Sequence, residues 1–133
     1  MRAVNPPGWP PPRGYANAIV AEGVQVFVAG QVGWTPAGRF ETDDLAGQVR
    51  QALENVRDVL AAAGARPADV TRLTWYVIDR REYLARLGAV GEAYRAVMGA
   101  HYPAMTLIEV RGLVEERARV EIEATAVIPR PAT

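Results

Sequence analysis

The sequence predicts an α+β domain in which two helices cover one face of a mixed sheet. Apolar and polar residues alternate in five stretches, which is the period of half-buried strands. In two other stretches the apolar residues recur every three or four positions, which is the period of amphipathic helices. The expected order is β-β-α-β-α-β-β. With 133 residues, half of them apolar, the chain fits a single hydrophobic core.

The first two strands are expected between residues 15 and 31. The stretches YANAIVAE and VQVFVAGQ flank the step Glu22-Gly23, and glycine is frequent in tight turns. In the second stretch valine alternates with other side chains, at Val24, Val26 and Val28. Residues 15–31 are therefore predicted to form a β-hairpin.

A long helix is expected from about Asp44 to Ala63. Thr42 or Asp43 is a suitable N-cap, acidic side chains stand in the first turn, and Gly64 suits the residue just past the end. One apolar stripe runs along the segment, formed by Leu45, Val49, Leu53, Val56, Leu60 and Ala63.

The remaining elements follow in the second half of the chain. VTRLTWYVI is rich in β-branched and aromatic residues and predicts a strand, and a second helix is expected from about Arg81 to Met98. Pro103 ends the next loop, and AMTLIEV and ARVEIEATAVI alternate as two further strands.

Prolines dominate the start of the chain, in NPPGWPPP. Because proline fixes φ and disfavours helix in the residue before it, this segment is expected to be extended and polyproline-like. We therefore divide the chain into a lead-in, residues 1–13, and a single domain, residues 14–129.

The charge pattern argues against two kinds of partner. Fifteen acidic and fifteen basic residues cancel, and no basic stripe is present, so no nucleic-acid partner is expected. The sequence has no signal-peptide pattern and no apolar run of roughly 20 residues, so no membrane partner is expected and a cytoplasmic location is predicted.

The residue types that are missing exclude several chemistries. The sequence contains no Cys, Ser or Lys, and His101 is its only histidine. Serine and cysteine nucleophiles, a lysine Schiff base, disulfides and thiolate metal sites are therefore excluded, and one histidine does not make the usual zinc cluster. Arg, Asp, Glu, Tyr, Thr, backbone groups and water remain for chemistry.

Six stretches in order resemble the RidA/YjgF family of enamine and imine deaminases, from about Gly14 to Val127. They are GYANAI, VFVAGQVG, QVRQALENVRDVLAAAGA, DVTRLTWYVIDRREY, YPAMTLIEVRGL and VEIEATAV. The resemblance implies a chorismate-mutase-like fold and a homotrimer with small-molecule ligands in the clefts between subunits. It also implies hydrolysis without a metal or other cofactor, in which an Arg binds the substrate carboxylate and a Glu positions water.

The resemblance assigns roles to individual residues. Tyr15 matches the tyrosine of the ligand cleft, Gly30 matches a backbone contact, and Glu121 matches the water-positioning glutamate. Met105 stands where the family has its carboxylate-binding Arg. Two further positions of the cleft differ, Ala29 for Ser and Gly91 for Asn.

Several of these residues have a second interpretation. Met105 is either an ordinary core residue or a cleft residue that selects a less polar ligand. Arg13, directly before Gly14, is either a solvated surface residue or a replacement anchor. Glu121 and Glu123 also fit the outer face of an amphipathic strand. Trp34 is either a ligand-stacking residue or part of the core or an interface.

Two functions from different classes follow. The first is hydrolytic deamination of a reactive enamine or imine, with a substrate preference altered by Met105. The second is a non-catalytic trimer, regulatory or binding a small metabolite, that uses the same cleft without the chemistry.

Overall fold

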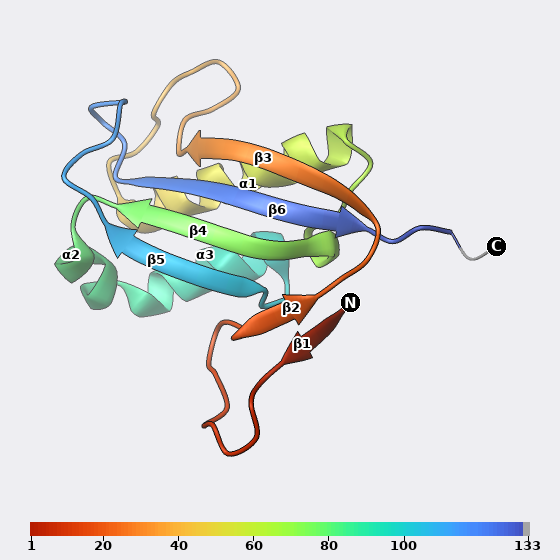
Figure 1. Ribbon diagram of the computed structural model, residues 1–133. Helices are drawn as coiled ribbons and strands as arrows, with labels where there is room; N and C mark the ends of the chain where they lie inside the picture. The colour runs from red at the N-terminus through yellow and green to blue at the C-terminus, as the bar shows by residue number, and fades with distance from the viewer. Residues whose placement is uncertain (132–133) are drawn as a thin grey trace.

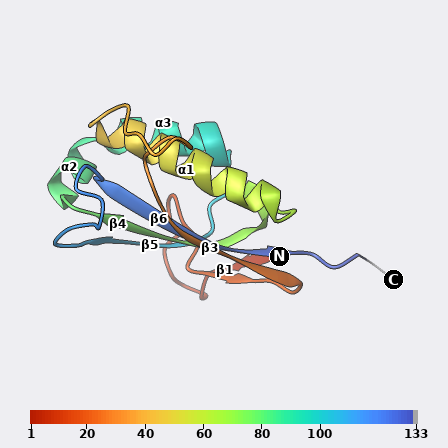
Figure 2. The same cartoon turned by 90° about the horizontal axis from the view of Figure 1, so that it is seen from above.

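The structure is a computed structural model that describes residues 1–131, and its main body has two layers (Figures 1 and 2). One layer is a four-stranded sheet, and helices cover one of its faces. The elements are β1 (Arg2–Val4), β2 (Ala18–Val20), β3 (Val24–Val32), α1 (Leu45–Ala62), a 3₁₀ turn (Pro67–Asp69), β4 (Val70–Val77), α2 (Arg80–Ala85), α3 (Leu87–Met98), β5 (Ala104–Glu109) and β6 (Val120–Ile128).

The four-stranded sheet has the order β3-β6-β4-β5. β4 and β5 are parallel and the other neighbours are antiparallel, so the predicted α+β class and mixed sheet are confirmed. Figure 2 shows α1 and α3 on the same side of the sheet. The opposite face, which we call the open face, is turned toward the viewer in Figure 1.

The structure has three helices where two were expected. The segment predicted as one helix from Arg81 to Met98 is divided at Arg86, whose ψ of 24° leaves the helical range. Asp79 caps α2 by accepting hydrogen bonds from the backbone N–H groups of Arg81 and Glu82. The apolar pattern continues across the break, which is why periodicity alone predicted a continuous helix.

The long helix α1 confirms the prediction closely. Its stripe from Leu45 to Leu60 is buried in the core, whereas Ala63 is exposed just past the end, before Gly64 with φ of 83°. The predicted caps Thr42 and Asp43 are wrong, and the first turn holds no acidic side chain. Asp44 is the cap because it directly precedes the first helical residue, and its carboxylate accepts from the Gly47 N–H at 3.0 Å.

The hairpin predicted for residues 15–31 does not form. β2 pairs with β1, and β3 pairs with β6 instead. At Gly23, with φ of 150°, a Cβ would collide with the Ile128 carbonyl, so the chain passes against the end of β6 rather than folding back on β2. The Ala16 N–H donates to the Pro103 carbonyl at 3.0 Å, which holds the N-terminal segment at the β5 edge (Figure 1).

β1 lies inside the predicted lead-in of residues 1–13, and the boundary proposed at residue 13 stays a prediction. None of the helices formed by residues 1–131 is both long and apolar enough to cross a bilayer.

Two polar side chains interrupt the apolar face of α1. Gln48 is fully buried; its amide donates to the carbonyls of Thr42 and Arg117, and its oxygen accepts from the Arg119 N–H at 2.7 Å. Asn55 donates to two carbonyls at the end of β3, that of the last strand residue Val32 at 3.1 Å and that of Trp34, two residues beyond, at 2.8 Å. These bonds satisfy backbone groups that the sheet leaves without partners.

Replacing Gln48 by Ala should lower the free energy of unfolding by about 2–4 kcal/mol, because it leaves buried backbone groups unpaired and opens a cavity. Urea unfolding followed by circular dichroism measures this change. Glu92 on α3 is exposed and its side chain makes no hydrogen bond or ion pair within residues 1–131, so Glu92→Ala is the control and should change stability by less than about 0.5 kcal/mol. Equal effects of the two changes would contradict the structural role of Gln48.

Candidate functional site

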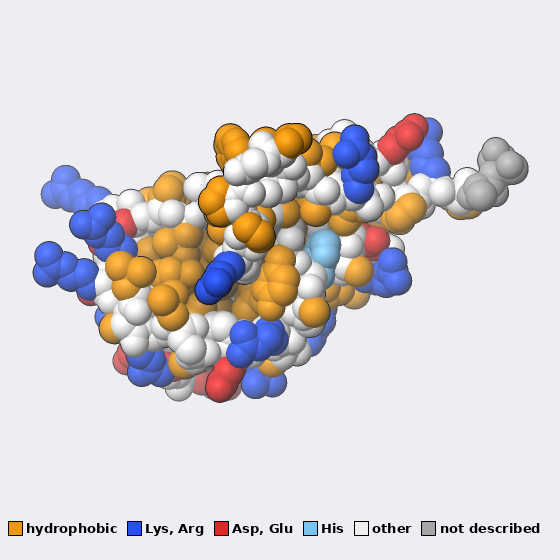
Figure 3. Space-filling model, turned by 90° about the horizontal axis from the view of Figure 1, so that it is seen from below, with side chains coloured by type: hydrophobic (Ala, Val, Ile, Leu, Met, Phe, Trp, Pro, Cys, Tyr) orange, Lys and Arg blue, Asp and Glu red, His pale blue; other side chains and the backbone are white. Residues whose placement is uncertain are grey.

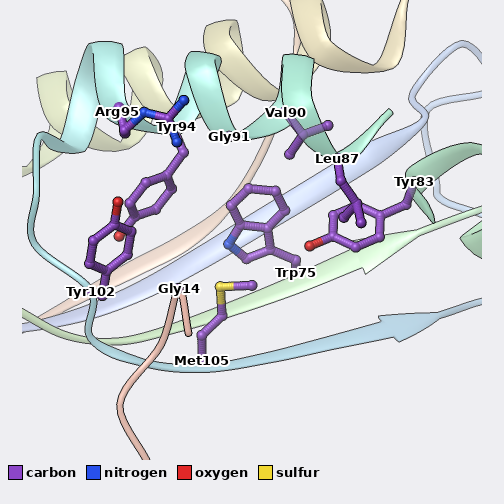
Figure 4. Close-up of a pocket in the computed structure, with 10 residues that line it drawn as sticks. All are labelled: Gly14, Trp75, Tyr83, Leu87, Val90, Gly91, Tyr94, Arg95, Tyr102 and Met105. Carbon is purple, nitrogen blue, oxygen red and sulfur yellow. The ribbon is translucent and has the colours of Figure 1, made fainter. Parts of the chain in front are cut away.

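A pocket of about 350 Å³ lies between α3 and the β4–β5 edge of the sheet (Figure 4). Figure 3 shows an apolar hollow on the underside of the molecule. Four of its ten lining residues are aromatic: Trp75, Tyr83, Tyr94 and Tyr102. We call it the aromatic pocket; its size and apolar lining are those of small-molecule sites.

The residues that line the pocket follow the two-residue period of a strand and the spacing of one face of a helix. On β4, Trp75 alternates with open-face residues and therefore points toward the helices. On α3, Leu87, Val90, Gly91 and Tyr94 follow the spacing of one helical face and border the same space. The pocket thus forms where the helix layer meets the edge of the sheet.

Tyr94 and His101 fix the loop that closes one end of the pocket. The Tyr94 ring stacks on Tyr102, with centroids 5.5 Å apart, and its hydroxyl donates to the His101 carbonyl. The His101 Nε2 lies 2.6 Å from the Val70 carbonyl oxygen, so this half-buried histidine attaches the loop to β4. Burial raises the pKa of the Tyr94 hydroxyl, which therefore stays neutral at physiological pH.

The indole of Trp75 has an unsatisfied donor. Only 2% of the residue is exposed, and its Nε1 has no hydrogen-bond partner in the structure. In Figure 4 the nitrogen faces the space beside Tyr94, Tyr102 and Met105. Most buried polar atoms in proteins are hydrogen-bonded, so Trp75 is an exception among residues 1–131. The nitrogen has less than 1 Å² of exposed surface, so it is enclosed by its neighbours in this structure.

Met105 lies in the wall of the same pocket. It is paired in register with Leu73 of β4, whose side chain faces the helices, so Met105 faces them as well. It is partly buried, packs against the core and also lines the pocket. The core and ligand-lining interpretations of Met105 are thus both compatible with its position.

Gly30 and Glu121 lie together on the other side of the sheet. A Cβ on Gly30 would overlap the Glu121 carboxylate, so only glycine leaves room for this side chain next to β3. Glu121 is in register with Tyr76 of β4, and both lie on the open face. The two residues are therefore separated from Met105 by the thickness of the sheet.

Glu123 lies beside Glu121 on the open face, as the alternation in β6 predicts. The Tyr76 hydroxyl donates to the Glu123 carboxylate at 2.6 Å, and this hydrogen bond is the main reason why the pKa of Tyr76 is raised above its ordinary value. Glu123 is thus engaged, whereas the carboxylate of Glu121 makes no hydrogen bond within residues 1–131.

The remaining predicted residues are dispersed. Tyr15 is 42% exposed and borders a second hollow that also touches Met105. Arg13, two residues earlier in the chain, is exposed. Trp34 lies beyond the end of β3 against Phe40, with ring centroids 5.8 Å apart, and does not line the aromatic pocket.

One charged residue in the lining was not predicted from the sequence. Arg95 of α3 borders the aromatic pocket, and Gly91, one turn earlier, lies beneath its guanidinium. A single arginine on a helix is usually a solvated surface residue, so its spacing carried no signal. Within residues 1–131, no group of three or more His, Asp or Glu side chains is placed to hold a metal ion.

The fold agrees with one known family. Residues 9–128 match the family model described as Endoribonuclease L-PSP, and the chain belongs to this family, the RidA/YjgF family.

Individual relatives are similar over most of the chain. A 2-iminobutanoate/2-iminopropanoate deaminase of Salmonella typhimurium is 34% identical over 105 residues, which are 79% of this chain and 80% of the relative. The crystal structure of a Rid family protein of unknown function, YyfB from Yersinia pestis, superposes with a TM-score of 0.84 at 36% identity and covers 96% of this chain and 98% of that one. The YjgF protein of E. coli gives a TM-score of 0.69 at 32% identity, with coverages of 85% and 87%.

Glu123→Gln should lower the pKa of Tyr76 toward its ordinary value of 10.0, because a neutral acceptor no longer disfavours the phenolate. Titration of ¹³C-labelled tyrosine by NMR, with Tyr76→Phe for assignment, measures the change. Glu121→Gln is the control and should have a smaller effect, since Glu121 acts on Tyr76 only through space. A larger shift from Glu121→Gln than from Glu123→Gln would contradict this arrangement.

Proposed function

We propose that the protein hydrolyses a reactive enamine or imine to ammonia and a keto acid, with a substrate preference altered by Met105. Membership in the RidA/YjgF family and the deaminase names of its relatives support the reaction class. The observation that carries the proposal is the position of Glu121, an open-face carboxylate that Gly30 leaves room for. Tyr15, which borders the second hollow, is the third residue that we assign to this site.

The proposed active site requires a second copy of the chain. Glu121 and Met105 occupy opposite faces of the sheet, so one small ligand cannot touch both within a single chain. An assembly in which the open face of one subunit meets the β5 edge of another would bring the two groups together. We propose a homotrimer with such clefts; the exposed Phe27 and Ile108 of the open face support assembly, because apolar side chains of this size favour contact with a partner.

The chemistry needs one base and one water. In the proposed mechanism, water attacks the imine carbon while the Glu121 carboxylate accepts a proton from it. The resulting carbinolamine loses ammonia when the C–N bond breaks, as the nitrogen takes up a proton and the oxygen gives one up to form the carbonyl. The sum is imine plus water to ketone plus ammonia, and no cofactor enters these steps.

Met105 changes what this site can bind. The family's Arg offers two parallel hydrogen bonds to a carboxylate, whereas a thioether offers an apolar surface and a weak acceptor. A short 2-imino acid is therefore held poorly at this position. We propose a substrate that gains its affinity from apolar contact.

The same substitution favours the second candidate, a non-catalytic trimer, regulatory or binding a small metabolite. Such a protein keeps the cleft and binds a ligand only in its folded state, so the ligand raises the melting temperature without turnover. The two candidates differ in one measurable property, the release of ammonia.

The deciding experiment measures the release of ammonia and keto acid from imines that an amino-acid oxidase generates in the assay. The amino acids supplied range from small to aromatic side chains. The wild type should release ammonia faster than spontaneous hydrolysis does. Glu121→Gln should lower this protein-dependent rate roughly 100-fold or more. Glu123→Gln is the matched control on the same strand face and should keep most of it. An unaffected Glu121→Gln variant would exclude the proposed base, and activity confined to Met105→Arg would favour the non-catalytic trimer.

The assembly is tested separately by light scattering. The wild type should have three times the 14.4 kDa mass of one chain. Phe27→Asp places a charge on an open-face side chain that is 74% exposed in one subunit, so it should shift the protein toward monomers. Val114→Asp, at a position 98% exposed, is the control and should stay trimeric. A wild-type protein that is monomeric at every concentration would refute the intersubunit cleft.

A further inference from the structure

The loss of a cation at Met105 raises the question of what binds a carboxylate in this chain. Arg95 is the one charged residue among those that line the aromatic pocket. Its guanidinium makes no ion pair and no hydrogen bond within residues 1–131, unlike those of Arg117 and Arg119, which pair with Asp43 and Glu82. Its charge is therefore available to a ligand.

The position of Arg95 depends on the glycine one turn earlier. The Arg95 Nη1 lies 3.1 Å from the point where a Cβ on Gly91 would stand, so the side chain lies back along α3 over the glycine. A contact of that length is tight, so a side chain at Gly91 would push the guanidinium outward. Figure 4 shows Arg95, Tyr94 and Gly91 on the helix above the pocket.

The rest of the pocket suits a planar apolar group. Trp75 and Tyr94 have ring centroids 6.3 Å apart, and Tyr94 is stacked on Tyr102. Met105 adds a polarisable sulfur, which makes favourable contacts with aromatic rings. Trp75 also lines the pocket, although only 2% of it is exposed.

We propose that the aromatic pocket binds an aromatic 2-imino acid and its 2-oxo acid product, with the carboxylate on Arg95 and the ring among Trp75, Tyr94 and Met105. Arg95 thus takes over, from the other wall of the pocket, the anchoring that Met105 cannot provide. The imino-acid part of this inference rests on the proposed deaminase function, whereas binding of the 2-oxo acid does not.

Calorimetric titration of the wild type compares phenylpyruvate with 2-oxobutanoate. Phenylpyruvate should bind roughly tenfold more tightly or better, because its ring buries apolar surface against the aromatic lining. Arg95→Gln should weaken phenylpyruvate binding about ten- to a hundredfold through loss of the charge-assisted pair. Arg57→Gln, at an exposed arginine of α1, is the matched control and should leave binding unchanged.

Two further comparisons separate anchoring from a general disturbance of the pocket. Phenylacetone lacks the carboxylate, so Arg95→Gln should bind it as the wild type does. Gly91→Ala should weaken phenylpyruvate binding by displacing Arg95, whereas Gly88→Ala, where a Cβ meets nothing within 4 Å, should not. Thermal unfolding of each variant confirms that it is folded.

The outcomes distinguish this inference from the proposed function. Phenylpyruvate that binds no better than 2-oxobutanoate, or equally well to Arg95→Gln, overturns the inference even if the protein deaminates small imines. Binding of phenylpyruvate that depends on Arg95, without any imine turnover, supports the pocket assignment and counts against the deaminase.

Discussion

The hydrogen bonds of Gln48 and Asn55 are the constraint on which the site depends. Both side chains lie on the sheet-facing side of α1, where an unpaired amide would be costly. Each is satisfied by backbone groups at the ends of strands, just before β6 for Gln48 and at and beyond the last residue of β3 for Asn55. Because β3 carries Gly30 and β6 carries Glu121, the same bonds that dock the helix also set the relative position of this pair.

A second constraint is the two-residue period of a strand. Side chains one position apart point to opposite faces, so a sheet covered by helices on one face necessarily divides its residues between a buried side and an open side. Met105 belongs to the helix side and Glu121 to the open side. The proposed site, which uses both positions around one ligand, therefore needs more than one subunit, and the exposed Phe27 and Ile108 on the open face support this proposal.

Elements whose energetics are local were predictable from the sequence. Helix α1 was predicted to within about one residue at each end, because its apolar stripe is long and Gly64 marks its end. The pairing of β2 with β1 was not predictable, since three-residue strands carry little pattern and the choice of partner depends on the tertiary contact between Gly23 and Ile128. The break at Arg86 was missed for a similar reason, as the apolar spacing runs through it.

Site residues could be predicted where the family resemblance assigned a role to a position in the sequence. They could not be predicted where the direction of a side chain determines whether it lines the pocket. Gly30 and Glu121 are adjacent, although nothing in the spacing of residues 30 and 121 indicates this. Arg95 has no distinguishing signal in the sequence, because its availability depends on a side chain that lies back over Gly91. The direction of the Arg95 side chain depends on the absence of a Cβ at Gly91, and this contact is visible only in the three-dimensional structure.

The departures at Met105 and Gly91 are best understood as one change rather than two. Exchanging a guanidinium for a thioether at the strand removes a charge-assisted pair and adds apolar surface, while a glycine on the facing helix admits a different guanidinium at the rim. Burial of a ring at about 25 cal/mol per Å² compensates for part of a lost ion pair once roughly 100 Å² are covered. In the proposed pocket the cation for the carboxylate moves from the strand to the helix, and the space that an arginine at position 105 would fill is open to the substrate's side chain. In this arrangement selectivity for large substrates comes from the shape and aromatic lining of the pocket, and the anchor only orients the ligand within it.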